Sequence, residues 1–91
     1  CLVQASDYLL NHVPYIGITI DLDAFDPNEI PGVSVPAKNG LFCAPFLEAL
    51  KTIIEKHHSS LIGYELVEFN PELDQNNKTI AFIKELLHTI I

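Results

Sequence analysis

Three acidic residues stand directly after apolar stretches of the chain, where their carboxylates could take part in chemistry. Asp21 and Asp23 follow the apolar residues 15–20, and Glu68 follows the apolar residues 61–67. Residues i and i+2 of a strand point to the same side, so the carboxylates of Asp21 and Asp23 would face one small volume. Two carboxylates that close repel each other unless a proton or a cation separates them. A divalent cation that prefers oxygen ligands, such as Mn²⁺ or Mg²⁺, would relieve that repulsion.

The same acids have a simpler interpretation, which the local pattern leaves open: one aspartate accepts backbone N–H groups of a turn and the other faces water. Spacing excludes two further motifs. An EF-hand loop starting at Asp21 needs glycine and glutamate where this chain has Asp26 and Gly32. A phosphotransferase motif of the Asp-x-Asp-x-Thr/Val type needs threonine or valine where Phe25 stands. Glu68 could hold a guanidinium or amidinium group through paired hydrogen bonds, or it could be an exposed strand-end glutamate.

The elements that would position these acids follow from the apolar pattern. Residues 15–20 and 61–67 do not alternate polar with apolar, which predicts strands buried on both faces, as in parallel sheets. A helix is predicted over residues 44–56, with cationic residues at its negative end, namely Lys56, His57 and His58. Its apolar stripe comprises Phe46, Leu47, Leu50, Ile53 and Ile54.

A last helix is predicted to begin after a cap at Asn76 or Asn77. Its predicted inner face comprises Ile80, Ile83, Leu87 and Ile90. The order strand, helix, strand, helix predicts an α/β fold in which a crossover helix joins two parallel strands. Parallel strands end at the same edge of a sheet, where α/β proteins bind ligands, so we expect Asp21, Asp23 and Glu68 to converge.

Composition limits the partners and the setting of the chain. Its 91 residues have a net charge of −7, with five lysines and no arginine against twelve acids, which argues against nucleic acid and against an anionic membrane surface. The two cysteines, Cys1 and Cys43, predict reduced thiols and a cytoplasmic location. A content of 48% hydrophobic residues is high for so short a chain, and methionine is absent. We therefore expect residues 1–91 to be a segment of a longer protein.

Residues 19–27, TIDLDAFDP, resemble the ureohydrolase signature Ser/Thr-x-Asp-x-Asp-x-x-Asp-Pro. The later features of that family follow in order: a Pro-Gly loop ending in Gly40 and Leu41, an amphipathic helix, the Glu-x-Asn-Pro box at residues 68–71, and Asp74. The resemblance to the arginase, agmatinase and formimidoylglutamase family extends from about residue 15 to the end. It implies the C-terminal βαβα part of a three-layer α/β/α arginase-like fold with a parallel sheet, residues 1–91 being the C-terminal segment of a single domain whose N-terminal part is absent.

The resemblance also implies roles for individual residues. Asp21 would bridge two Mn²⁺ ions, Asp23 would bind one of them, Glu68 would hold the guanidinium or formimino group of the substrate, and Asp26 would fix the loop. A metal-activated water would then attack an amidine-type carbon. The family's other metal ligands lie in Gly-Gly-x-His and Asp-Ala-His-x-Asp segments that this sequence lacks. We therefore assign no catalytic residue within the chain and expect it alone to bind metal weakly and hydrolyse nothing.

Residues 31–36, PGVSVP, resemble the Pro-Gly-Val-Ser-Ala-Pro of formimidoylglutamases more than the Thr-Gly-Thr-Pro of arginases and agmatinases. Val35 stands where the second threonine would be. This favours hydrolysis of N-formimidoyl-L-glutamate to L-glutamate and formamide, a step of histidine degradation. The alternatives are agmatinase or arginase activity releasing urea, a non-catalytic ureohydrolase-like subunit, and a small acidic metal-buffer domain. The resemblance further implies a homo-oligomer.

Overall fold

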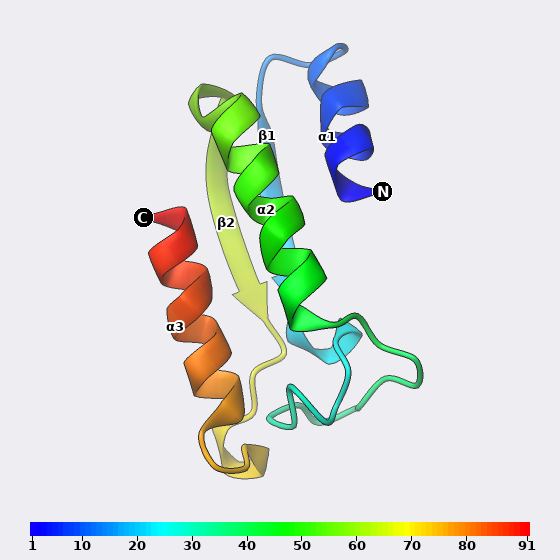
Figure 1. The fold of residues 1–91 in the computed structure, drawn as a ribbon, viewed down its shortest axis with the longest axis vertical. Helices are drawn as coiled ribbons and strands as arrows, with labels where there is room; N and C mark the ends of the chain where they lie inside the picture. The colour runs from blue at the N-terminus through cyan, green and yellow to red at the C-terminus, as the bar shows by residue number, and fades with distance from the viewer.

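A computed structural model describes residues 1–91 as two parallel strands and three helices (Figure 1). The helices and strands occur in the order α1 (Leu2–Leu10), β1 (Ile16–Asp21), α2 (Cys43–His57), β2 (Leu61–Val67) and α3 (Lys78–Ile90). Single 3₁₀ turns span Leu22–Ala24, His58–Ser60 and Pro71–Leu73. The predicted βαβα order and the parallel sheet are confirmed. None of the helices has the length and apolar character needed to cross a bilayer.

The strands pair in parallel from Ile16 opposite Leu61 to Asp21 opposite Val67, with one irregularity at the start of the ladder. β2 has the predicted bounds. β1 starts and ends one residue later than predicted, so Asp21 is its last residue rather than the first residue of the following loop. The register therefore ends with Asp21 beside Val67, the residue that precedes Glu68.

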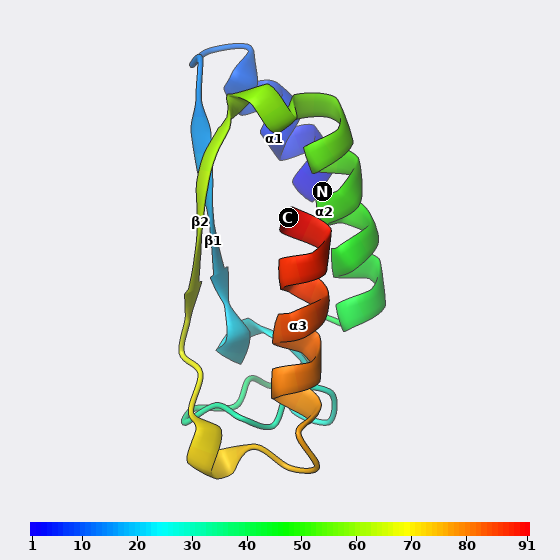
Figure 2. The same ribbon diagram turned by 90° about the vertical axis from the view of Figure 1, so that its left-hand side faces the viewer.

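All three helices lie on one face of this sheet (Figure 2). The prediction that both strands are buried on both faces is therefore wrong for residues 1–91, because side chains on the uncovered face meet solvent. Thr19 and its partner Glu65 lie on that face and are exposed, whereas Ile20, which pairs with Leu66, faces the helices and is buried.

The core lies between the sheet, α2, α3 and the loop after β1. As predicted, α2 turns Leu47, Leu50 and Ile53 into the core, with Phe46 and Ile54 half-buried at its margin. The loop contributes core residues of its own: Leu22, Phe25, Ile30 and Val33. Phe25 packs edge-on against Phe46 and Phe82, with ring centroids 5.0 Å apart in both pairs. The loop that carries the acidic signature is thus a packed part of the fold.

The inner face of α3 differs from the prediction. Thr79, Phe82 and Leu86 are its buried residues, whereas Leu87 is 49% exposed. Ile80, Ile83 and Ile90 are half-buried, and Ile83 and Ile90 pack against the core from its margin. Phe82 sets this orientation because its ring packs against Phe25 of the loop. The predicted face is displaced by one residue, with Leu87 in place of Leu86, and one residue of an α-helix corresponds to about 100° of rotation about its axis.

The cap of α3 also differs from the prediction. Asn77 precedes the helix, but its side chain makes no capping hydrogen bond, and both Asn76 and Asn77 have left-handed backbones, with φ of 53° and 57°. Asp74 caps the helix from further back. Its Oδ1 accepts the N–H of Thr79 at 2.9 Å and its Oδ2 accepts the N–H of Ile80 at 3.2 Å. Partial burial opposes ionisation of Asp74, but these hydrogen bonds outweigh it and lower its pKa.

Replacing Asp74 by alanine is expected to lower the local stability of α3 by about 1 kcal/mol, the usual loss for a capping side chain. Because the folded-state pKa of Asp74 is lowered, its contribution is present above the unfolded-state pKa and is lost as pH falls through the folded-state value. Amide hydrogen exchange at residues 79 and 80 measures both effects. Asp74→Asn keeps an acceptor oxygen and should lose less. A larger loss for Asn77→Gly than for Asp74→Ala would contradict this assignment.

Candidate metal and substrate site

Asp21 and Asp23 meet at the carboxyl end of β1. Asp21 is the last residue of the strand, Asp23 lies in the 3₁₀ turn that follows, and the side chain of Leu22 between them is fully buried. The buried Leu22 anchors the turn, so both carboxylates remain at the surface of this edge. The backbone N–H of Asp23 donates to Oδ1 of Asp21 at 3.2 Å. That bond fixes the orientation of the Asp21 carboxylate. It also agrees with the simpler interpretation, in which an aspartate accepts a backbone N–H group of the turn.

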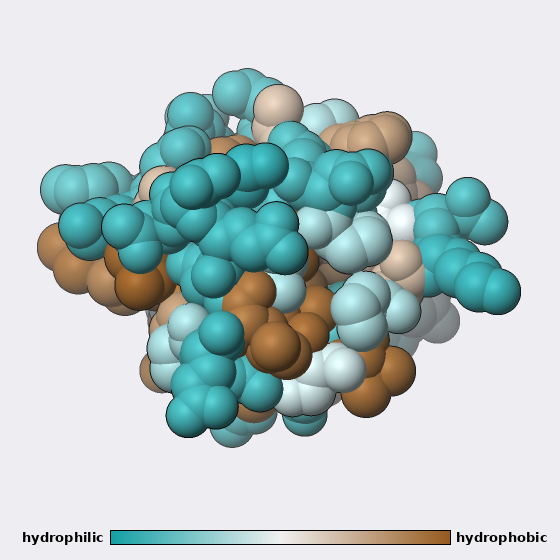
Figure 3. Space-filling model, turned by 90° about the horizontal axis from the view of Figure 1, so that it is seen from below, coloured by the Kyte–Doolittle hydropathy of each residue, from teal (hydrophilic) through white to brown (hydrophobic).

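The strand register places the third acid near the first two, because Asp21 pairs with Val67, the residue before Glu68. A hydrogen bond between the side chains of Asp23 and Asp21, burial, and repulsion by the charges of Asp21 and Glu68 together raise the pKa of Asp23. The carboxyl ends of β1 and β2 therefore bring Asp21, Asp23 and Glu68 together, as the parallel topology predicts. Hydrophilic side chains dominate this end of the molecule, with hydrophobic ones showing between them (Figure 3).

Glu68 has an unusual backbone conformation. Its φ of 69° lies in the left-handed region, which costs an L-residue other than glycine about 1 kcal/mol or more. β2 stops at Val67, so Glu68 leaves the strand direction immediately after the residue that pairs with Asp21. Its side chain is exposed. A strained, exposed carboxylate beside two others is an arrangement suited to binding a cationic group.

The donor set fits part of a site for a divalent cation. Two aspartate carboxylates repel each other at one strand end, and oxygen ligands suit Mn²⁺ or Mg²⁺. Residues 1–91 contain no group of three or more His, Cys, Asp or Glu side chains that could hold a metal ion. Glu68 is thus close enough to influence Asp23 but does not complete a ligand set.

The histidines do not join this site. His57 ends α2 and His58 follows it, at the amino end of β2 and so at the opposite edge of the sheet (Figure 1). His57 Nε2 lies 2.6 Å from Oδ1 of Asp7, and Lys56 Nζ lies 2.9 Å from Oδ2 of the same carboxylate. The contact with His57, followed by that with Lys56, lowers the pKa of Asp7. The two basic residues end the helix as predicted. The sequence did not predict their contact with Asp7 of α1, which lies about fifty positions away along the chain.

The signature loop is closed by backbone contacts. The N–H of Asp26 donates to the carbonyl of Leu41 at 2.8 Å, and the N–H of Leu41 donates to the carbonyl of Ala24 at 2.9 Å. Asp26 also accepts the N–H of Asn28 at 2.8 Å, which confirms that it fixes the loop. Gly40 passes so close to Phe25 that a Cβ on it would lie 2.3 Å from the Phe25 carbonyl carbon, so only glycine fits there.

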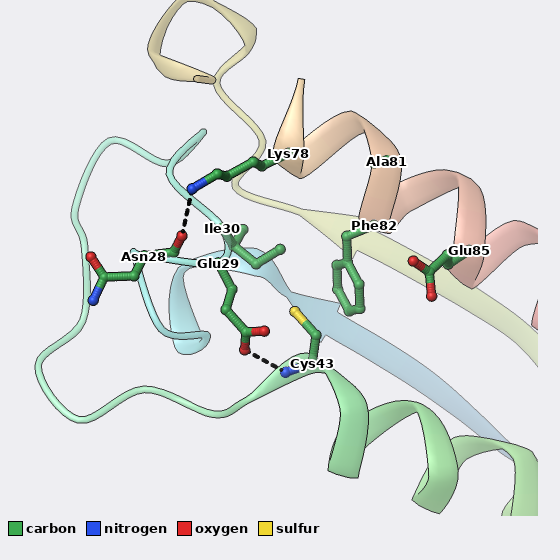
Figure 4. Close-up of a pocket in the computed structure, with 8 residues that line it drawn as sticks. All are labelled: Asn28, Glu29, Ile30, Cys43, Lys78, Ala81, Phe82 and Glu85. Atoms are coloured by element: carbon green, nitrogen blue, oxygen red, sulfur yellow. Dashed lines mark hydrogen bonds between the residues drawn. The ribbon is translucent and has the colours of Figure 1, made fainter. Parts of the chain in front are cut away.

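A separate pocket of about 390 Å³ lies between the loop, α2 and α3 (Figure 4). Glu29 accepts the N–H of Cys43 at 2.9 Å there and so serves the first turn of α2. Burial, followed by the charges of Glu29 and Glu85, raises the pKa of the Cys43 thiol to about 12, which keeps it protonated and unreactive. Both cysteines are free thiols, as predicted. The three site acids are absent from its lining, so this pocket is distinct from the carboxylate site.

Comparison with known proteins identifies the family of the chain. Residues 2–91 match the sequence profile of the arginase family. The chain belongs to the arginase family. A formimidoylglutamase from Staphylococcus carnosus is 35% identical over 93% of the chain and 27% of its own length. An arginase from Bacillus caldovelox is 31% identical over 91% of the chain and 27% of its own length.

Solved arginase structures give the same result for the fold. The structure of Bacillus caldovelox arginase superposes with a TM-score of 0.85 and 28% identity, over 98% of this chain and 29% of that one. Helicobacter pylori arginase also gives a TM-score of 0.85, with 27% identity over 98% of this chain and 30% of that one. The chain thus has an arginase-family fold and spans about a quarter of the length of the curated relatives it matches.

The left-handed backbone of Glu68 predicts a reversal of the usual ranking of alanine and glycine. In the full-length protein, Glu68→Gly should be more stable than Glu68→Ala by about 1 kcal/mol, because glycine adopts positive φ without steric cost. Glu65, within β2, is the matched control, and there glycine should be the less stable of the two variants. Urea denaturation of the four variants measures the difference. An alanine variant as stable as the glycine variant at position 68 would disprove the strain.

Proposed function

We propose that the protein containing this chain is a manganese-dependent hydrolase of a linear amidine-type C–N bond. Its favoured substrate is N-formimidoyl-L-glutamate, which is hydrolysed to L-glutamate and formamide in histidine degradation. The observation that carries the proposal is the Asp21–Asp23 pair at the end of β1 with Glu68 close by at the end of β2. We further propose a homo-oligomer in the cytoplasm, where two free thiols would stay reduced.

Asp21 and Asp23 are proposed as metal ligands, Asp21 between two ions and Asp23 on one. The Asp23 N–H holds Oδ1 of Asp21, so the orientation of that carboxylate is set before a metal arrives. The hydrogen bond with Asp21, burial, and repulsion by Asp21 and Glu68 raise the pKa of Asp23, and a cation would relieve the repulsion. Bound ions would supply an activated water and stabilise developing negative charge. The remaining ligands would come from parts of the protein outside residues 1–91.

Glu68 is proposed to bind the substrate rather than a metal. A protonated formimino or guanidinium group is a planar cation with paired N–H donors, and a carboxylate can accept two of them side by side. Glu68 is exposed at the strand edge, so such a group can reach it. Its bond to the substrate would hold the reacting carbon beside the aspartate pair and leave that carbon open to attack.

The choice of formimidoylglutamate depends on the loop of residues 31–36. Val35 is 72% exposed and brings no hydroxyl to the site, unlike the threonine at the corresponding place in arginases and agmatinases. Relatives named formimidoylglutamase are 32–35% identical to the chain, which agrees with this preference. An arginase relative at 31% identity makes urea-releasing activity on arginine or agmatine the second candidate.

The test uses the full-length protein loaded with Mn²⁺ and offered N-formimidoyl-L-glutamate, agmatine and L-arginine separately. We expect glutamate and formamide from the first substrate and loss of turnover on chelation or in Asp21→Asn. Glu68→Gln should lower kcat/KM by about 10²-fold, because it removes a charged hydrogen-bond acceptor from the substrate cation. Glu55→Gln, the same change on the exposed side of α2, is the control and should keep full activity.

Each other outcome has a definite meaning. Urea from arginine or agmatine would keep the metal chemistry and replace the substrate. Full activity in Glu68→Gln would remove Glu68 from the site. Bound manganese without turnover of any of the three compounds would contradict the proposed hydrolase.

A further inference from the structure

The loop of residues 31–36 is attached to the fold at a buried point. The N–H of Gly32 donates to Oγ1 of Thr79 at 2.9 Å, in a fully buried hydrogen bond. A Cβ at position 32 would lie 2.9 Å from that oxygen, so the close approach requires glycine. Thr79 lies in the first turn of α3, whose start Asp74 caps. This attachment fixes the base of the loop.

A second attachment joins the loop to the end of β2. The N–H of Asn70 donates to the carbonyl of Gly32 at 2.7 Å, and Nδ2 of Asn70 donates to Oγ of Ser34 at 3.0 Å. Oδ1 of the same side chain accepts the N–H of Glu72 at 3.1 Å, so both ends of the amide are engaged. Asn70 stands two residues after Glu68, and Ser34 stands one residue before Val35. The bond between Asn70 and Ser34 therefore links the proposed substrate-binding acid to the proposed specificity loop.

The two attachments differ in burial, and this separates their effects. The bond between Gly32 and Thr79 is buried, so its loss would cost folding stability. The bond between Asn70 and Ser34 is exposed, and water can replace either partner, so its loss would cost little stability. Its consequence is positional. Glu68 holds a strained φ of 69°, and such a conformation persists only when the residues around it restrain it. The β ladder restrains Val67 on one side, and Asn70 restrains the other.

We propose that Ser34 and Asn70 are positioning residues, whose mutual hydrogen bond holds Glu68 and the tip of the 31–36 loop in register for binding the amidino substrate. This inference rests on the proposed function, since it assigns Ser34 and Asn70 to the site that Glu68 forms. Glu68 would grip the substrate in the ground state and the transition state alike. Loss of the bond should therefore change substrate affinity more than the chemical step.

Steady-state kinetics of the full-length protein with Mn²⁺ test the proposal, using whichever of the three amidino substrates the wild type hydrolyses. Ser34→Ala removes the oxygen that accepts the hydrogen bond from Nδ2 of Asn70. Because the net free energy of one such bond is lost, we expect KM to rise about 3- to 10-fold, with kcat within about twofold of the wild type. Ser34→Thr keeps the hydroxyl and should keep the wild-type KM. Lys38→Ala, an exposed change two residues beyond this loop, is the control for nonspecific loosening.

Hydrogen exchange gives a readout that does not depend on turnover. If the bond restrains the end of β2, Ser34→Ala should speed exchange of the amides at residues 68–70 while residues 61–66 stay as in the wild type. An unchanged KM, or a lower melting temperature with KM unchanged, would show a merely structural bond and overturn the proposal. Unchanged exchange at residues 68–70 in Ser34→Ala would overturn the positioning role, whether or not the wild type hydrolyses any of the substrates. Absence of turnover in the wild type would by itself contradict only the proposed function.

Discussion

β1 and β2 pair as parallel strands, and their last pair is Asp21 and Val67. The rest of the site depends on that register. Parallel pairing sends both strands toward the same edge, so acids separated by more than forty residues in sequence become neighbours. A shift of one residue in either strand would turn each side chain to the other face and separate Glu68 from the aspartates. α2 makes the pairing possible because it returns the chain to the start of the sheet, and its buried Leu47, Leu50 and Ile53 hold it there.

This arrangement brings like charges together, which is unfavourable, and surrounding contacts stabilise it. Repulsion by Asp21 and Glu68 contributes to the raised pKa of Asp23, and Glu68 adopts a strained backbone. Surrounding contacts offset these costs. The N–H of Asp23 donates to the Asp21 carboxylate, and the side chain of Asn70 connects the end of β2 to the loop. The loop itself is closely packed where Gly40 passes Phe25. Local strain maintained by a firm surrounding structure is typical of binding sites.

Local patterns in the sequence predicted the elements and the strand-end acids, because periodicity and strand ends are properties of adjacent residues. They did not predict contacts between distant residues. Asp74 rather than Asn77 caps α3, because two left-handed asparagines turn the chain before the helix begins. Phe82 rather than Leu87 defines the inner face of α3, because it packs on Phe25. The carboxylate of Asp7 reaches His57 across the α1–α2 contact. The uncovered sheet face was missed because an apolar strand alone does not reveal what covers it.

The central claim is that β1 and β2 deliver two metal-binding aspartates and one substrate-binding glutamate to a single edge. A crystal structure of the full-length protein grown with Mn²⁺, with anomalous data collected at the manganese edge, tests this most directly. Two anomalous peaks are expected, one bonded to carboxylate oxygens of both Asp21 and Asp23 and the other to Asp21, with Glu68 facing the pair but unbound to either ion. Peaks away from Asp21 and Asp23, or a peak coordinated by Glu68, would contradict the account.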